Sequence, residues 1–282
     1  MLVEVFCWLC GIAAVVLGHF TVNEIRFDAW YSFVFAILIF LGAYLIGLIL
    51  MFVIYYLIGL PIKIGHEYKK PKKFYHFLFF QGVDYLCFHA KIHCRFKGQD
   101  LLPRGKKFLL VCNHKSNYDP ILIAKKLRRY DFAFVSKVEN FKIPLLNRYL
   151  SALCYLPVNR SDLLQSLDML KRASNYIQND VLSVGVFPEG KRYKAEGVGE
   201  FHEGFFNVAI KNNIPLVVCT VKNTENIAKN LPFKWSRTKV EVVRIFEPEE
   251  IAGLPAKELS DECRRLMEEN LKKPYPSPRH QK

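Results

Sequence analysis

The stretch that decides the fold is residues 108–120, FLLVCNHKSNYDP. Five apolar residues come first, and a short apolar run bounded by turn residues is typical of a buried strand. The next residues are too rich in Asn and Ser for a regular helix, whereas Pro120 opens an apolar segment of helical character. The stretch therefore predicts a strand over 108–112, a polar turn that carries His114, and a helix over 120–129.

The same alternation continues on both sides of this stretch. Strands are predicted over 91–97, 132–136, 181–187, 215–221 and 240–246, and helices over 144–154, 161–179, 205–212 and 258–273. Ser161 is the expected N-cap of its helix. Alternating elements predict an α/β domain, a mixed sheet flanked by helices. Ligands of such sheets usually bind beyond the carboxyl ends of the strands, which points to His114 and to the turn after Phe187.

The N-terminal part has a different composition, because residues 29–62 carry no charged side chain. About 20 apolar residues in a helix cross the ~30 Å hydrocarbon layer of a bilayer. A shorter apolar run, 5–20, is expected either to span or to form the first arm of a helical hairpin. A cleaved signal peptide is disfavoured, since no Lys or Arg precedes Arg26. We predict a membrane anchor over 1–60, a basic and aromatic interfacial segment over 61–90, and a cytosolic α/β domain over 91–282.

Charge supports this division of the chain. Of 40 basic and 26 acidic residues, residues 1–60 hold one and three, so the remainder carries an excess of +16. Such an excess attracts nucleic acid, an anionic membrane or phosphorylated substrates. By the positive-inside rule, lysines directly after the long apolar run predict a cytosolic domain; these are Lys63, Lys69, Lys70, Lys72 and Lys73.

Two further segments allow more than one interpretation. Residues 74–88, FYHFLFFQGVDYLCF, fit an aromatic helix at the headgroup boundary and fit a buried core helix equally well. Cys7 and Cys10 form a CxxC pair within an apolar helix, where packing is favoured over zinc binding. No metal site is expected, and the scattered cysteines suit a reducing compartment.

His114 is the candidate general base. An aspartate five positions later, Asp119, can turn back so that its carboxylate meets the imidazole, fixes the tautomer and stabilises the imidazolium. The alternatives are a loop histidine with an unrelated hydrogen bond and an Asp-Pro turn. Ser116 lacks the strand–turn–helix elbow of a serine hydrolase nucleophile.

A second polar turn, VFPEGKRY at 186–193, follows a predicted strand. Pro188 and Gly190 tighten the turn, and Arg192 can hold a phosphate by two hydrogen bonds. The alternative is a surface turn with solvated charges.

Together with Arg160 in YLPVNR and the strand that begins at Pro215, these pieces resemble the four ordered blocks of the glycerolipid acyltransferase family, most closely the 1-acylglycerol-3-phosphate acyltransferases. The matching residues are Asn113, His114 and Asp119 in the first block, Lys137, Glu139 and Arg160 in the second, Phe187, Pro188, Glu189, Gly190 and Arg192 in the third, and Pro215 in the fourth.

The resemblance implies roles for these residues. His114 and Asp119 would form the catalytic pair. The acceptor's glycerol-phosphate end would be bound by Lys137, Arg160, Glu189, Gly190 and Arg192. Three positions depart from the family pattern: Lys191 and Tyr193 in the third block, and Cys154, which stands where a glycine is usual.

The implied activity is transfer of a fatty acyl group from acyl-CoA or acyl carrier protein to the sn-2 hydroxyl of 1-acylglycerol-3-phosphate, which gives phosphatidate. Direct transfer needs no acyl-enzyme and no cofactor, and a backbone N–H near His114 is the default oxyanion donor. Alternatives are another lysophospholipid or glycerol-3-phosphate as acceptor, and a non-enzymatic tether that binds anionic lipid. A nucleic-acid partner is not expected. The expected location is a bacterial cell membrane or the endoplasmic reticulum.

Overall fold

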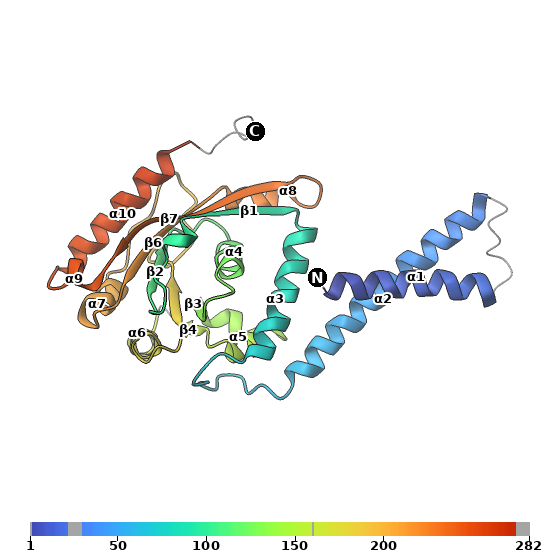
Figure 1. Cartoon of the computed structure of the whole chain (residues 1–282), viewed down its shortest axis with the longest axis horizontal. Helices are drawn as coiled ribbons and strands as arrows, with labels where there is room; N and C mark the ends of the chain where they lie inside the picture. Colours follow the sequence, from blue (N-terminus) through green and yellow to red (C-terminus); the bar gives the residue numbers. More distant parts are fainter. Residues whose placement is uncertain (1, 22–29, 160, 275–282) are drawn as a thin grey trace.

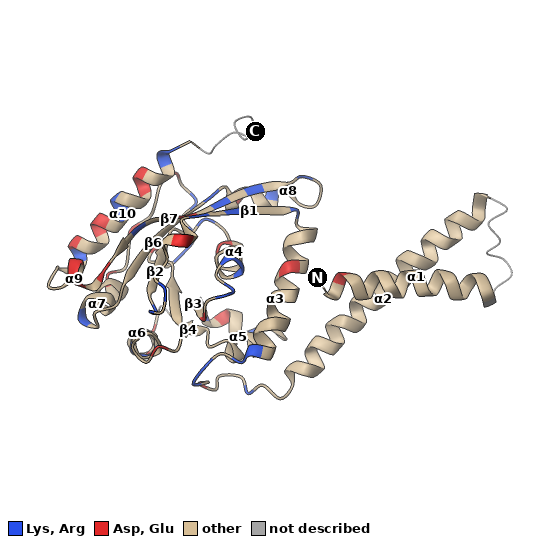
Figure 2. Cartoon of the chain, in the orientation of Figure 1, with Lys and Arg blue, Asp and Glu red and all other residues tan. Residues whose placement is uncertain are grey.

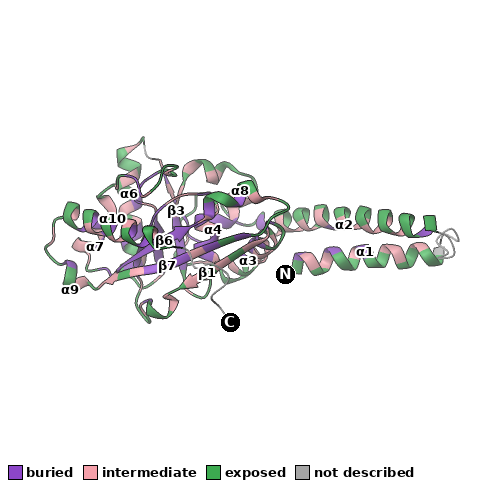
Figure 3. Ribbon diagram, turned by 90° about the horizontal axis from the view of Figure 1, so that it is seen from above, coloured by how far each residue is buried: buried purple, intermediate pink, exposed green. Residues whose placement is uncertain are grey.

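The chain forms a helical hairpin joined to an α/β domain (Figure 1); the computed structural model describes residues 2–21, 30–159 and 161–274. Helices α1 (Leu2–Thr21) and α2 (Trp30–Gly59) pack against each other. Both are long and apolar enough to be candidate membrane spans. Their large apolar side chains are mostly exposed (Figure 3). An exposed apolar surface of this size suits lipid rather than water.

The α/β domain is built on a seven-stranded sheet in the order β1-β7-β6-β2-β5-β3-β4. Neighbouring strands are parallel except β6 and β7, so β1 and β7 run against the other five. The strands are β1 (Ile92–Lys97), β2 (Leu109–Cys112), β3 (Phe132–Lys137), β4 (Leu156–Val158), β5 (Ser183–Val186), β6 (Leu216–Lys222) and β7 (Ser236–Phe246). The predicted mixed α/β fold is confirmed.

Helices cover both faces of the sheet (Figure 1). One face carries α6, α7 and α10, and the other carries α3 and α4. The helices are α3 (Lys73–His89), α4 (Asp119–Lys126), α5 (Leu146–Ala152), α6 (Leu163–Gln178), α7 (Gly204–Lys211), α8 (Ile227–Asn230), α9 (Pro248–Ile251) and α10 (Ala256–Lys272), with short 3-10 turns η1 (Gln99–Leu101), η2 (Val138–Lys142) and η3 (Thr224–Asn226). The central strands β2, β5 and β6 are buried on both faces, which explains their continuous apolar sequences.

Helix α6 begins differently from the sequence expectation. Asp162, not Ser161, is its N-cap, and the Asp162 side chain accepts a hydrogen bond from the backbone N–H of Gln165 at 3.0 Å. The Ser161 hydroxyl instead donates to Asn159 Oδ1 at 2.7 Å. A carboxylate is the stronger partner for the positive end of a helix, which explains the shift by one residue.

Helix α3 combines both interpretations of the aromatic segment. Phe80, Val83 and Cys87 are buried in the core of the α/β domain, while Phe74 and Phe77 are exposed. The helix is therefore amphipathic, with one aromatic face available to an interface.

The start of the hairpin is joined to α3 by polar contacts. Leu2 N–H donates to Gln81 Oε1 at 3.0 Å, and Glu4 Oε2 lies 2.7 Å from His89 Nε2. Glu4 is the single Asp, Glu, Lys or Arg side chain in the described part of the hairpin, and Figure 2 shows that charged residues gather on the α/β domain. This contact places the first turn of α1 beside the last turn of α3.

The end of the hairpin is held by α5. Arg148 Nη1 donates to the carbonyl oxygens of Leu60 at 2.9 Å and Ile62 at 2.8 Å, just past the last turn of α2. Tyr149 donates its hydroxyl to the carbonyl of Tyr55 at 3.0 Å. A cation that satisfies carbonyl groups at a helix end stabilises that end, so α5 fixes where α2 leaves the α/β domain.

Candidate active site

The two polar turns meet because β2 and β5 are parallel neighbours. Their carboxyl ends lie at the same sheet edge, so the loop that starts at Asn113 and the turn after Val186 face each other. Asn113 is buried, and its amide exchanges hydrogen bonds with the backbone of Val221 in β6, at 2.8 and 3.2 Å. This pairing ties the His114 loop to the third strand of the edge.

His114 and Asp119 are in contact. His114 Nδ1 lies 2.8 Å from Asp119 Oδ2, and the same oxygen accepts the backbone N–H groups of Lys115 and Ser116 at 2.7 Å each. Asp119, the first residue of α4, is completely buried. The three hydrogen bonds to Oδ2 fix the position of this carboxylate. With Nδ1 directed at Asp119, the Nε2 atom of the ring is left to take up a proton.

Phe187 holds the imidazole from one side. Its ring stacks on His114 with centroids 4.2 Å apart and planes 18° from parallel. Phe134 from β3 stacks on Phe187 in turn, at 5.1 Å. The sequence analysis assigned no role to Phe187. An aromatic residue at the end of a strand that points to the same sheet edge as His114 could have indicated a ring contact. This aromatic stack restricts the imidazole ring of His114 and shields it partly from water.

Glu189 points inward. Its two oxygens accept the backbone N–H of His114 at 2.8 Å and of Gly199 at 3.2 Å, and the residue is 4% exposed. Burial raises the pKa of this carboxyl group, although the hydrogen bonds from His114 and Gly199 act in the opposite direction. Glu189 therefore links the loop of His114 to the loop of Gly199. Direct contact with a phosphate is disfavoured, because both carboxylate oxygens already accept hydrogen bonds and the carboxylate would repel a second anion.

The rest of the second turn packs onto the first. Gly190 has a φ of +68°, a conformation that a side chain disfavours, and its N–H closes the turn onto the Phe187 carbonyl at 3.0 Å. Tyr193 N–H donates to the His114 carbonyl at 2.8 Å. Lys115 lies over the Tyr193 ring at 5.1 Å and donates to two carbonyl oxygens, those of Ala195 and Gly197. Tyr193 and Lys115 therefore stabilise the loop.

Two predicted anion-binding cations remain free at this edge. Lys137 ends β3 and Arg192 follows β5, both are exposed, and neither has a partner among the described residues. Lys191 is exposed as well. Arg160 lies outside the described residues. The free guanidinium of Arg192 can form two parallel hydrogen bonds to a phosphate.

The expectation of a backbone N–H oxyanion donor near His114 stays a prediction, but three of the nearby N–H groups are already occupied. The backbone N–H groups of His114, Lys115 and Ser116 all donate to Glu189 or Asp119, so none of the three is free for a developing oxyanion. The Ser116 hydroxyl accepts the N–H of Tyr118 at 3.3 Å, which leaves it directed along its own turn.

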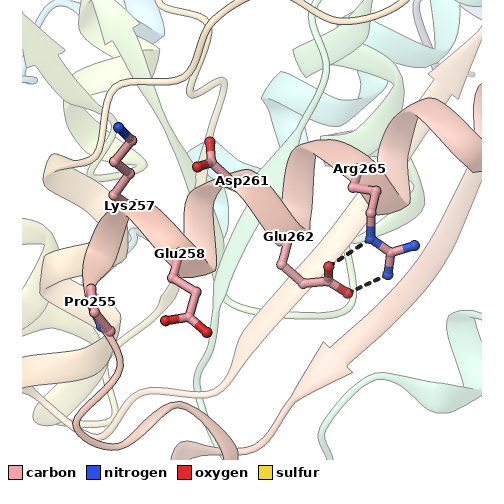
Figure 4. A pocket seen from close by; sticks show the side chains of 6 residues that line it. All are labelled: Pro255, Lys257, Glu258, Asp261, Glu262 and Arg265. Atoms are coloured by element: carbon pink, nitrogen blue, oxygen red, sulfur yellow. Dashed lines mark hydrogen bonds and ion pairs between the residues drawn. The ribbon is translucent and has the colours of Figure 1, made fainter.

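No metal centre is evident in residues 2–21, 30–159 and 161–274, where no three His, Cys, Asp or Glu side chains form a group able to hold an ion. A shallow hollow lies elsewhere, beside the start of α10, with an ion pair between Glu262 and Arg265 at 2.7 Å (Figure 4). All the side chains that line it come from α10 or the residue before it, so it is separate from the His114 edge.

Comparison with known proteins matches this architecture. A model of the acyltransferase family matches residues 93–222. The 1-acyl-sn-glycerol-3-phosphate acyltransferase of Salmonella typhimurium is 26% identical over 184 residues, 65% of this chain and 74% of that protein. The chloroplastic 1-acyl-sn-glycerol-3-phosphate acyltransferase LPAT1 of Arabidopsis thaliana is 32% identical over 159 residues, 55% of this chain and 43% of that protein. The crystal structure of the acyltransferase PlsC from Thermotoga maritima has the same fold, with a TM-score of 0.56 at 21% identity, over 69% of this chain and 81% of that one.

Proposed function

We propose that the chain is an acyltransferase of the family whose model matches residues 93–222, and that it transfers a fatty acyl group from a thioester donor to the sn-2 hydroxyl of 1-acylglycerol-3-phosphate, giving phosphatidate. The observation that carries the proposal is the pair of His114 and Asp119, 2.8 Å apart at the carboxyl edge of the sheet. Relatives named for this acceptor, a free guanidinium at the same edge and a candidate membrane hairpin support the choice of substrate.

In the proposed reaction, His114 Nε2 takes the proton of the acceptor hydroxyl as its oxygen attacks the thioester carbonyl. Asp119 stabilises the imidazolium that forms. The carbon–sulfur bond then breaks, and the departing thiolate takes up the proton that the imidazolium holds. A thiol pKa of about 8.5 makes this leaving group a good one at neutral pH, so no acyl-enzyme is needed. The donor is acyl-CoA or acyl carrier protein, and no other cofactor takes part.

Arg192 and Lys137 are the proposed contacts for the acceptor phosphate, together with Arg160. A phosphate monoester carries more charge than the diester of a larger headgroup, which suits several cations. Gly190 and Glu189 would act on this site indirectly, by keeping the turn and the His114 loop in place.

We further propose that the hairpin sits in the membrane with the α/β domain on the cytosolic side, where both thioester donors occur. Support comes from the lysines between α2 and α3 and at the first residue of α3, on the domain side of the hairpin: Lys63, Lys69, Lys70, Lys72 and Lys73. Trypsin should cut this segment in inside-out vesicles and spare it in sealed right-side-out cells.

The acceptor is tested by competition. Purified protein in mixed micelles receives one labelled acyl thioester with equal amounts of lysophosphatidate, lysophosphatidylcholine, lysophosphatidylglycerol and glycerol-3-phosphate. We expect label chiefly in phosphatidate. Label mainly in a diester phospholipid, or in lysophosphatidate, would overturn the acceptor, and no label in any product would favour the non-enzymatic tether.

A further inference from the structure

The turn between α8 and β7 lies at the same sheet edge as His114. Strand β6 is parallel to β2 and leads directly into η3 and α8, so this segment begins where the carboxyl ends of both strands lie. Strand β7 then runs back antiparallel to β6 from Ser236. Residues 231–235 therefore project beyond the edge that carries the proposed catalytic pair.

This turn presents two large aromatic side chains to the outside. Phe233 is 83% exposed and Trp235 is 64% exposed, with the exposed Lys234 between them. Within the α/β domain, most other aromatic rings are at least partly buried. Two exposed rings in one short turn are costly in water and indicate a surface that contacts something apolar.

The turn is continuous with the base of the hairpin. Lys91 Nζ donates to the Phe233 carbonyl at 3.2 Å, and the Lys91 carbonyl accepts the N–H of Ser236 at 2.9 Å. Lys91 lies two residues after His89, which contacts Glu4 of α1. Figures 1 and 3, from two directions, both show the turn on the side of the domain from which α1 and α2 project.

The charges around the rings suit an anionic bilayer. Over residues 223–237 the exposed charged side chains are Lys229, Lys234 and Arg237 against Glu225. Cations near a leaflet that contains anionic lipid are attracted to it, and Trp is enriched at the headgroup level of membranes. A soluble protein partner would explain the rings alone, whereas the lipid surface explains the rings, the cations and the neighbouring hairpin together.

We propose that Phe233, Lys234 and Trp235 form a second membrane contact, in which both rings enter the headgroup region of an anionic phospholipid bilayer beside the hairpin. With attachment at two points, the His114 edge of the sheet faces the lipid and cannot swing freely about the hairpin. The membrane contact stands on the placement of the turn; its effect on acyl transfer rests on the proposed function.

The test is lipid quenching of Trp235 in the full chain. The sequence has three tryptophans, so Trp8→Phe and Trp30→Phe leave Trp235 alone. In nanodiscs that contain anionic lipid, we expect its emission to be shifted to the blue and quenched by lipids brominated near the headgroup. A matched control adds Trp235→Phe and Lys257→Trp, which moves the sole tryptophan to the exposed surface of α10 at the far end of the domain. The control should remain unquenched.

Emission typical of water and no quenching of Trp235 would overturn the proposal. Emission that changes with protein concentration in detergent but ignores brominated lipid would assign the rings to a second copy of the chain, and would overturn it equally. Should the double Phe background fail to fold, the wild type and Trp235→Phe are compared directly, and the quenched signal lost in the variant is that of Trp235.

Activity gives a second measurement. Phe233→Ser with Trp235→Ser should lower transfer to an acceptor embedded in anionic vesicles and spare transfer to the same acceptor in detergent micelles. Equal loss in both would indicate a structural role and contradict the proposal. Because the fluorescence does not depend on turnover, failure of the proposed acyl transfer leaves the membrane test intact.

Discussion

At the residue scale, the chemistry depends on which atoms are already occupied. Asp119 accepts three hydrogen bonds through Oδ2, one of them from His114, and Glu189 accepts the His114 backbone N–H. The two carboxylates thus hold the ring and the backbone of one histidine. The described contacts of His114 hold its backbone and its Nδ1 atom, so Nε2 is the ring nitrogen left for the proposed acceptor.

Replacement of the base should abolish most activity. His114→Ala removes the proposed general base, and loss of a general base lowers turnover by about 10² to 10⁴-fold. Asp119→Asn should act in the same direction, because the imidazolium loses its charged partner. The measurement is kcat with labelled thioester, and His93→Ala, an exposed histidine on β1, is the control. Near-normal kcat for His114→Ala would refute the mechanism.

Loss of Arg192 should raise the KM for the acceptor more than the KM for the thioester donor. A hydrogen bond to a charged group contributes about 1.5–3 kcal/mol, so Arg192→Ala should raise the KM for lysophosphatidate roughly ten- to a hundredfold. The KM for the thioester should change little. Lys211→Ala, at the last residue of α7 and the opposite edge of the sheet, controls for the loss of one positive charge. Equal changes in both KM values would instead assign Arg192 to the donor or to the fold.

At the element scale, packing between elements sets where the site and the anchor lie. The parallel order of β6, β2 and β5 brings Val221, Asn113 and Glu189 to one edge. Helix α5 contacts the end of α2 through Arg148, and α3 contacts the start of α1 through His89. The hairpin is therefore attached to the α/β domain at both of its helices.

Arg148→Ala should loosen the end of α2. The carbonyl groups of Leu60 and Ile62 lose their cationic partner, so the segment between α2 and α3 should open more often. Limited trypsin digestion at Lys63 to Lys70 measures this as a faster rate. Arg129→Ala removes an exposed arginine of the same domain and should leave the rate unchanged. An unchanged rate in Arg148→Ala as well would show that apolar packing alone holds the helix.

Glu241 links β1 and β7 in a way that depends on pH. Burial alone would raise the pKa of this carboxyl group, but hydrogen bonds from Lys239, Lys97 and Asn270 outweigh it and lower the pKa to about 2. Because the folded state prefers the ionised form, its stabilising effect is complete above the ordinary pKa of 4.5 and is lost as the pH falls through about 2.

Glu241→Gln should therefore lower the free energy of unfolding at neutral pH and flatten its dependence between pH 4.5 and 2. Thermal unfolding in detergent, followed by circular dichroism, provides the comparison. Glu225→Gln, an exposed carboxyl in η3, is the control. A wild-type slope retained in Glu241→Gln would contradict the assignment.

At the scale of the whole molecule, the hairpin and the α/β domain differ in the surface that they expose. The exposed apolar side chains of the hairpin suit a bilayer. The α/β domain buries a core of its own, which includes Ile62 from the segment after α2. The boundary near residue 61 remains a prediction.

Deletion of residues 1–60 keeps Ile62 and all four sequence blocks. Transfer to a micellar acceptor should persist in part, while transfer to an acceptor in vesicles should fall much further, since the domain must now find the membrane by its basic and aromatic surface alone. The ratio of the two rates is the measurement. Complete loss of both would mean that the hairpin belongs to the core of the catalytic domain.

The sequence alone determines those features that depend on residues close together in the chain. The uncharged run 29–62 predicts α2, and apolar runs bounded by Pro, Gly and Asn predict the strands. His114 and Asp119 are five residues apart, so a single turn is enough to join them. The sequence shows Cys154 where a glycine is usual, and the structure shows why glycine suits this position: φ is +61°, a conformation that glycine adopts without strain.

The tertiary structure decided what depends on distant contacts. Glu189 is 75 residues from His114, and its inward orientation follows from the pairing of β2 with β5, which the periodicity of either strand does not specify. The antiparallel β7 likewise sends Phe233 and Trp235 to the His114 edge. Periodicity encodes which face of an element is buried, whereas the order of strands is chosen by the packing of the whole core. For that reason the sequence named most residues of the candidate site, and the fold decided which of them face a substrate and which hold the others in place.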